Sequence, residues 1–343
     1  MKQYNIYPTY YDKFQCIAAD CTDCCCAYWQ VAIDNETALM YECVEGEMGE
    51  RLRLSQTIDV DGDRVFRLKE DRCPFLEKSG LCEIQRRLGE EYLCATCYSY
   101  PRAVQEYSDF AEHDLSLSCP EAARLILSES VHSGYIEYLD EVPDYELLYT
   151  PEFMDMLRGT REILRRIICE PGFTTQRIVQ ECYEYSKLVQ KNIKNRSYEI
   201  PEYIMMNRKV PEEISYVDLI DHFLSKEILT EEWREMLLDA RKLGEKKLYY
   251  PEFNELRKLM VSFSNGYRRL FLYYIDRYWL RANIDCNVVG KIHKMVKAYI
   301  ILRRLQTAYY VKNKELPFSA SVRIVQLYSK EVEHSATSEY DFW

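Results

Sequence analysis

From about residue 131 onward, hydrophobic and polar residues follow the period of amphipathic helices. Apolar side chains recur every three or four positions, and polar loops with prolines separate the repeating segments. One helix is expected from Pro151, which suits a first helical turn, to Glu170, just before Pro171-Gly172. The same pattern predicts further helices at about residues 175–194, 211–226, 230–245, 252–281, 286–312 and 319–334.

The first 130 residues follow a different pattern, in which the apolar runs are short. Residues 29–33 alternate between larger apolar side chains and polar or small ones, which predicts a half-buried strand. Asp34 is a suitable N-cap for a helix that Gly46 would end. A β-hairpin is expected within residues 57–68, around a turn at Asp61-Gly62.

Together these patterns predict a mainly α protein in two parts. We expect a small cysteine-rich α+β metal-binding module in residues 1–130 and a helical domain in residues 131–343. A chain of 343 residues can bury full hydrophobic cores without disulfide bonds. Its most hydrophobic candidate for a membrane span, Leu270–Leu280, contains Asp276 and Arg277, so no membrane segment is expected.

The net charge and the N-terminal residues indicate which partners and which cellular compartment to expect. A net charge of −11 opposes a phosphate backbone, so we do not expect nucleic acid as a partner. Residues 1–8 lack the basic start and the long apolar run of a secretory signal, which favours a cytoplasmic location. Thiols stay reduced in that compartment, so disulfide bonds are the least favoured use of the cysteines.

The cysteines are concentrated near the start of the chain. Eleven of the fourteen precede residue 120, and five of them fall within residues 16–26. Packing does not require so many adjacent thiols, because neighbouring side chains point in different directions. Most of these cysteines are expected in loops and at helix starts, where free N–H groups stabilise thiolates. This density indicates metal chemistry.

The spacing of the cysteines alone does not decide between a zinc site and an iron–sulfur cluster. The pairs Cys21/Cys24 and Cys94/Cys97 have the Cys-x2-Cys spacing of a tetrahedral zinc site. A cluster of several irons could instead use the more widely spaced thiolates that this choice leaves out. The sequence lacks the Cys-x3-Cys-x2-Cys signature of radical enzymes, because Tyr28 stands where the third cysteine would be. A glycine-rich turn between a strand and a helix, as in nucleotide-binding folds, is absent too.

Several segments of the chain resemble the flagellin lysine-N-methylases. The resemblance rests on the pattern of cysteines and their neighbours in the first part, and it resumes near the C-terminus. The matching segments are Cys16–Trp29, Cys73–Gln85, Thr96–Arg102, Leu117–Glu121, Ile275–Leu280 and Tyr328–Ser335. The first part is also similar to small cysteine-cluster proteins that bind zinc or iron.

The resemblance implies a methyl transfer from S-adenosylmethionine to lysine side chains of flagellin, in a protein that carries a [4Fe–4S] cluster. Cys24 and Cys94 stand where the family has other residues, so they are left out of the ligand pool. The candidate ligands that fall on the family pattern are Cys16, Cys21, Cys25, Cys26, Cys73, Cys82, Cys97 and Cys119. One cluster needs four of these eight, and the sequence leaves open which four.

Glu331 and His334 are the candidate catalytic residues, near the end of the chain. A lysine amine must be neutral to accept a methyl group, so a base or a desolvating site is required beside it. Carboxylates of the last helix could take that proton, although such residues are more commonly a solvated helix face. The alternative function is a zinc- or iron-binding cysteine-cluster protein whose helical part mediates interactions without catalysis.

Overall fold

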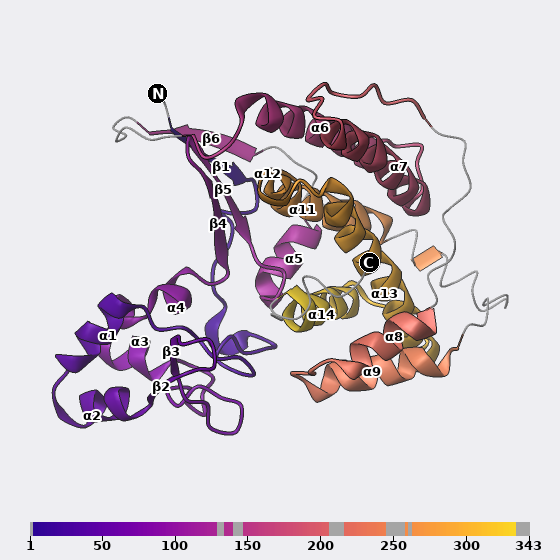
Figure 1. The fold of residues 1–343 in the computed structure, drawn as a ribbon. Coiled ribbons are helices and arrows are strands. Elements are labelled where there is room, and N and C mark those ends of the chain that lie inside the picture. Colours follow the sequence, from indigo (N-terminus) through magenta and orange to yellow (C-terminus); the bar gives the residue numbers. More distant parts are fainter. Residues whose placement is uncertain are drawn as a thin grey trace.

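The structure is a computed structural model that describes residues 3–128, 134–139, 147–205, 216–244, 258–259 and 263–333. Figure 1 shows a small lobe beside a larger helical body, with a sheet along one side of that body. Helices dominate the described residues, and the cysteine-rich lobe has two short strands between short helices. The predicted mainly α class is confirmed.

The small lobe consists of short elements joined by cysteine-bearing loops. Asp34 caps its first helix as predicted, because the Asp34 carboxylate accepts a hydrogen bond of 2.9 Å from the Thr37 N–H. The lobe contains α1 (Asn35–Glu42), α2 (Gly46–Leu54), β2 (Gln56–Ile58), β3 (Arg64–Phe66), α3 (Glu83–Leu88) and α4 (Ala95–Ser99). The predicted hairpin is present as the antiparallel pair β2–β3.

Two local predictions for this lobe need correction. Residues 29–33 do not form a strand, because Ala27 bridges to Arg72 whereas Ala32 bridges to Val65, and no continuous ladder results. Gly46 does not simply end a helix. Its positive φ of 74° turns the chain from α1 into α2, a second helix that the pattern did not predict.

A four-stranded sheet joins the start of the chain to the helical body. The sheet has the order β4-β5-β1-β6, in which β1 runs parallel to β5 and antiparallel to β6. Its strands are β1 (Tyr4–Pro8), β4 (Arg102–Tyr107), β5 (Phe110–Leu115) and β6 (Gly134–Tyr138). The loop that follows β1 carries the first cysteines, so the sheet fixes where that loop begins.

The helical body follows the predicted pattern closely within the described residues. It consists of α5 (Pro120–Ser128), α6 (Pro151–Cys169), α7 (Thr175–Lys194), α8 (Tyr216–Ser225), α9 (Glu231–Lys242), α11 (Ser264–Tyr278), α12 (Ala282–Asp285), α13 (Val288–Asn313) and α14 (Phe318–Tyr328). A π-helical turn, η4 (Ser329–Glu333), continues α14. Most of the first half of the helix predicted at 252–281 lies outside the described residues. None of the helices in the described parts of the chain is long and apolar enough to cross a membrane.

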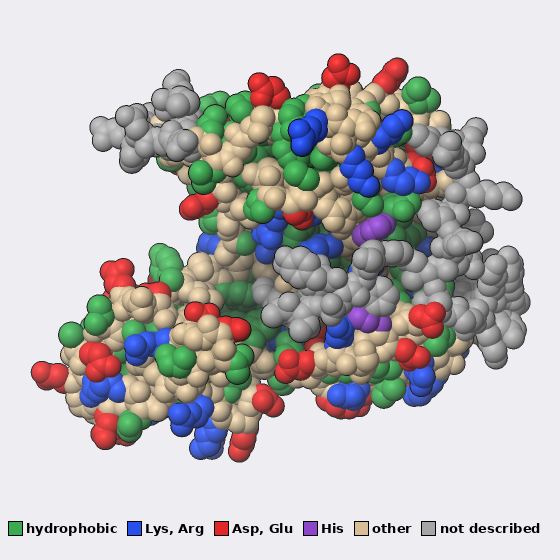
Figure 2. All heavy atoms as spheres, in the orientation of Figure 1, with side chains coloured by type: hydrophobic (Ala, Val, Ile, Leu, Met, Phe, Trp, Pro, Cys, Tyr) green, Lys and Arg blue, Asp and Glu red, His purple; other side chains and the backbone are tan. Residues whose placement is uncertain are grey.

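Two hydrophobic clusters stabilise the described residues. The small core belongs to the lobe and includes Val31, Tyr41, Phe75 and Cys94. The large core fills the helical body, including α5, and extends into the sheet; Cys119, directly before α5, belongs to it. The division into modules at residue 130 stays a prediction; within the body, α5, which precedes residue 130, packs against α11 and α14. On the face shown in Figure 2, acidic and basic side chains are interspersed over the small lobe, and the surface is indented between this lobe and the sheet end of the body.

Candidate functional site

The candidate site is built around the loop that joins β1 to the small lobe. All fourteen cysteines are free thiols in the structure, and ten of the eleven early ones lie in this loop, in the lobe's connections or at the start of α5. Cys82 and Cys94 are the N-cap residues of α3 and α4, and Cys119 directly precedes α5. These three thiols therefore lie at helix starts, as predicted from the sequence, although Cys82 and Cys94 make no side-chain capping hydrogen bond.

The segment Cys24–Cys26 forms a tight turn of three adjacent thiols. The Cys26 N–H donates to the Cys24 sulfur at 3.3 Å, and the sulfurs of Cys25 and Cys26 lie 4.0 Å apart. Trp29 donates from its indole nitrogen to the Cys25 carbonyl at 3.0 Å, which holds the turn in place. Hydrogen bonding from the Cys26 side chain lowers the pKa of the Cys24 thiol to about 6. A thiolate is therefore available in this turn at neutral pH.

The turn contacts the small lobe directly. The Cys73 N–H donates to the Cys26 carbonyl at 2.8 Å, and Cys73, Cys82 and Cys97 pack against the small core that contains Cys94. Within the described ranges, no three Cys, His, Asp or Glu side chains are grouped so that they could hold a metal ion. Thiolates are the usual ligands of iron–sulfur clusters, so the donor atoms of this cysteine-rich part suit a cluster by their chemistry.

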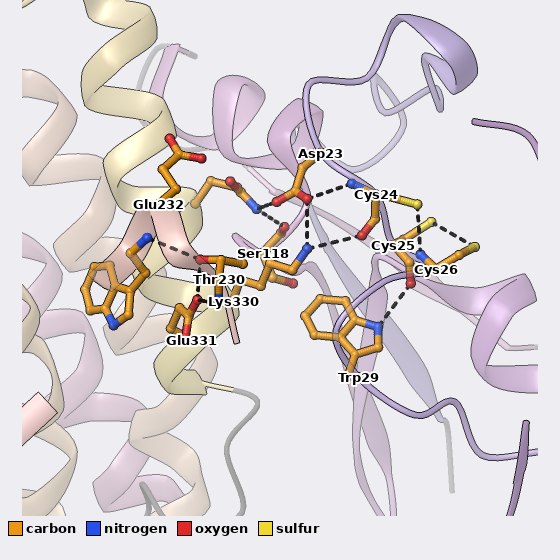
Figure 3. A network of polar contacts seen from close by, with 12 residues as sticks. Asp23, Cys24, Cys25, Cys26, Trp29, Ser118, Thr230, Glu232, Lys330 and Glu331 are labelled. Carbon is orange, nitrogen blue, oxygen red and sulfur yellow. Dashed lines mark hydrogen bonds and ion pairs between the residues drawn. The ribbon is translucent and has the colours of Figure 1, made fainter. Parts of the chain in front are cut away.

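The C-terminal helix docks onto the same turn through a buried ion pair. Lys330 of η4 is 1% exposed, and its ammonium lies 2.9 Å from the Asp23 carboxylate and 3.2 Å from the Cys24 carbonyl oxygen. The ammonium also lies over the rings of Tyr28 and Trp29, at 5.0 and 4.8 Å from their centroids. Figure 3 shows Lys330 reaching from the helix toward Asp23 and the three cysteines.

Two further side chains of α14 strengthen this contact. Arg323 and Gln326 both donate to Oδ2 of Asp23, at 3.0 and 2.9 Å, whereas Lys330 contacts Oδ1. Gln326 also donates to the Ser118 carbonyl at 2.7 Å, directly beside Cys119. Burial raises the pKa of Asp23, but the charges of Lys330 and Arg323 and the hydrogen bonds outweigh it, so the pKa is lowered overall. The helix thus binds both ends of the cysteine-rich part.

Glu331, a predicted catalytic residue, points toward α9 instead of the cysteines. Its carboxylate accepts hydrogen bonds from the Leu229 and Thr230 N–H groups, both at 2.8 Å, and from the Thr230 hydroxyl at 2.5 Å. Burial raises the pKa of Glu331 despite these donors. Glu331 therefore stabilises the start of α9, where Thr230 is the N-cap. The catalytic role of Glu331 stays a prediction. His334, the other predicted catalytic residue, lies outside the described residues.

Glu333 at the end of η4 anchors the same segment on its other side. The hydroxyls of Tyr273, Tyr274 and Tyr278 donate to its carboxylate at 3.2, 2.9 and 3.1 Å. Sequence reasoning named Glu331 but missed Asp23 and Lys330, although Asp23 lies between Cys21 and Cys24 and Lys330 lies within a matching segment. A charged residue between closely spaced cysteines was the available signal.

Comparison with known proteins confirms the resemblance to lysine-N-methylases. The chain is 29% identical over 136 residues to the lysine-N-methylase of Salmonella typhimurium, a match that covers 36% of this chain and 32% of that protein. The lysine-N-methylase of Salmonella choleraesuis matches at the same identity and over the same share of its length. The flagellar biosynthetic protein FliU of Salmonella muenchen is also 29% identical over 136 residues, which cover 76% of its length.

The match spans about a third of the length of these two lysine-N-methylases. No family model matches the chain. No solved structure matches it either.

Proposed function

We propose that this protein transfers methyl groups from S-adenosylmethionine to lysine side chains of flagellin. The observation that carries the proposal is the contact of Lys330 with Asp23 and Cys24. It joins the cysteine segment and the terminal helix, the two segments that separately resemble flagellin lysine-N-methylases. A bare metal-binding module would not need that helix, whereas an enzyme that assembles one site from both would.

The proposal includes an iron–sulfur cluster held by thiols of the cysteine-rich part. The Cys24–Cys26 turn, the N–H groups at the helix starts and the free state of the thiols support this choice of ligand. When bound, such a cluster would supply an iron able to bind the amino and carboxylate groups of S-adenosylmethionine. The protein would be expected to contain iron and acid-labile sulfide and to be brown when purified without oxygen.

The chain must also remove a proton from the acceptor lysine. An amine can attack a methyl group only in its neutral form, which requires desolvation or a base within hydrogen-bond reach. We propose Glu331 and His334 for this role. The raised pKa of the Glu331 carboxyl is in the direction that suits a base working near neutral pH. Glu331 would have to exchange one of its bonds to Thr230 for the amine.

The experiment that tests the proposal combines the reconstituted protein with flagellin and S-adenosylmethionine. Peptide mass spectrometry should show added mass in steps of one methyl group on flagellin lysines. Replacing Cys25 and Cys26 together by Ala should abolish transfer through loss of the cluster, whereas replacing the remote, exposed Cys43 by Ser should not. Flagellin that binds the cluster-loaded protein and stays unmethylated would favour the alternative of a non-catalytic metal-binding scaffold.

A further inference from the structure

The carboxylate of Glu333 is held by three hydroxyl groups and lacks a direct positive partner in the described part of the chain. Tyr274 donates to its Oε1 at 2.9 Å, and Tyr273 and Tyr278 donate to its Oε2 at 3.2 and 3.1 Å. Glu333 is half-buried, and no described Lys, Arg or His nitrogen lies within 4.0 Å of its oxygens. Carboxylates removed from water are normally paired with a cation. This carboxylate is therefore suited to a cationic ligand.

The three hydroxyls leave part of the Glu333 carboxylate unused. A carboxylate has about four acceptor positions, two on each oxygen. Tyr273 and Tyr278 occupy those of Oε2, whereas Oε1 receives only Tyr274 among the contacts that the described residues make. All three tyrosines belong to α11 and are 2–6% exposed, so they fix the direction of the carboxylate. One position on Oε1 is available to a further donor.

The rings of the same tyrosines form an aromatic surface beside the carboxylate. We name Tyr273, Tyr274 and Tyr278 the tyrosine wall. The rings of Tyr274 and Tyr278 are stacked with centroids 5.7 Å apart, and the ring of Tyr273 lies edge-to-face on Tyr274 at 5.6 Å. The ammonium of Lys294 lies 4.9 Å from the Tyr278 centroid, as expected for a ring face that attracts cations. The wall therefore suits an ammonium group.

Arg277 lies over the tyrosine wall but is directed to another carboxylate. Its guanidinium is 5.6 and 5.9 Å from the ring centroids of Tyr273 and Tyr278, and it contacts the Asp114 carboxylate at 3.4 Å. Asp114 belongs to β5 of the sheet. The charge of Arg277 is thus shared with the sheet, and Glu333 makes no ion pair with it.

The position of Glu333 connects it with the cysteine turn. Lys330, three residues earlier in η4, contacts the Cys24 carbonyl at 3.2 Å. Three residues of helix span only about 5 Å along the axis. Glu331, in contrast, points toward α9 and is occupied by three donors of Leu229 and Thr230. Of these two carboxylates, Glu333 has the acceptor position to offer.

We propose that Glu333 and the tyrosine wall bind the ammonium group of the acceptor lysine. The ammonium donates to Oε1 of Glu333, and the methylene groups of the lysine pack against the rings. This assignment rests on the proposed function and names the residues that recognise its substrate.

The single open position also predicts a preference for lysine over arginine. A guanidinium binds a carboxylate best through two parallel N–H groups, one to each oxygen. Tyr273 and Tyr278 already occupy Oε2 of Glu333, which leaves no place for the second N–H group. An ammonium is a compact charge that needs only one acceptor here.

Binding of small amines to the full chain tests the proposal. The probes are Nα-acetyl-lysine amide and its norleucine analogue, which lacks the ammonium, and calorimetry or NMR measures their affinity. The wild type should bind the lysine probe about 10- to 100-fold more tightly than the norleucine probe. Glu333→Gln should abolish this preference, whereas Glu152→Gln, at the exposed start of α6, should keep it. Equal binding of both probes by the wild type, or an unchanged preference in Glu333→Gln, would overturn the proposal.

A second variant keeps the test decisive if Glu333→Gln does not fold. Tyr278→Leu retains the carboxylate and removes one ring of the wall, so the preference for the lysine probe should fall about threefold. An unchanged preference in the folded Tyr278→Leu variant would exclude the wall from the site.

The titration uses neither a methyl donor nor a cluster, so its result is separate from the proposed function. If the wild type methylates flagellin but does not distinguish the two probes, the lysine site at Glu333 is wrong and the methyl transfer stands. If the wild type prefers the lysine probe and never methylates flagellin, the binding site stands and the proposed function is wrong.

Discussion

The ammonium of Lys330 lies 2.9 Å from the carboxylate of Asp23, across a separation of 307 residues in sequence. Both side chains are almost fully removed from water, with 1% and 8% exposure. An ion pair in such surroundings is costly to break, because the remaining partner stays buried and charged. The pair therefore fixes the C-terminal helix against the cysteine turn.

Lys330→Met should weaken the attachment of the helix to the turn. Because Arg323 and Gln326 still bind Asp23, we expect the free energy of unfolding to fall by about 2–3 kcal/mol, somewhat less than for a wholly unpaired charge. Denaturant titration measures this change. The double variant Asp23→Asn/Lys330→Met should lose less than the sum of the two single variants. Additive losses would mean that the two residues do not stabilise each other.

Glu331→Ala should destabilise the protein through the start of α9. The variant leaves three donors of Leu229 and Thr230 without an acceptor, which should cost about 1–3 kcal/mol. Glu331→Gln retains one acceptor oxygen and should cost less, while the metal content and colour stay unchanged. If Glu331 is the base, methyl transfer by the folded Glu331→Gln variant should nevertheless be slower. Equal rates for this variant and the wild type would restrict Glu331 to capping.

Asp114 should make stability fall as the pH rises from about 4 to 6. Burial raises its pKa to about 6, although Arg277 lies 3.4 Å away and Tyr10 donates to it. The unfolded value is about 3.9, so between these values the folded state holds the extra proton. The contribution of the Asp114 carboxyl to the free energy of unfolding is therefore fully present below pH 4. It falls by about 3 kcal/mol as the pH rises toward 6.

The control for this pH dependence is Asp114→Asn, which cannot ionise. Comparison of the two unfolding free energies across this range should show a smaller fall with pH for Asp114→Asn than for the wild type. The two proteins would have parallel profiles if Asp114 ionised normally in the folded state.

Metal removal should unfold the small lobe and leave most of the helical body folded. The lobe consists of helices and strands of only three to nine residues around its small core, so it has little packing of its own to keep it folded. The body is stabilised by the large core. Limited proteolysis after anaerobic chelation should cut within residues 16–100, and far-UV circular dichroism should keep most of the helical signal. Equal resistance of both parts would contradict the modular interpretation.

Local features of the sequence predicted α1, the β2–β3 hairpin and the long helices of the body, but not the four-stranded sheet. Asp34 as a helix cap, the Asp61-Gly62 hairpin and Pro151 at the start of α6 each depend on a few neighbouring residues. Such preferences act within one or two turns of chain, so they can be recognised without knowledge of the fold. The density of cysteines near the start of the chain likewise indicates metal chemistry by itself, because packing does not require so many adjacent thiols.

Tertiary structure alone decided which of these elements meet. The parallel pairing of β1 with β5, the docking of Lys330 onto Asp23 and the direction of Glu331 toward α9 all join segments far apart in sequence. The same holds for Cys94, which the family pattern set aside and which lies in the small core that Cys73, Cys82 and Cys97 pack against. Hydrophobic burial and the pairing of buried charges act between whole surfaces, and their partners are defined only once the chain has folded.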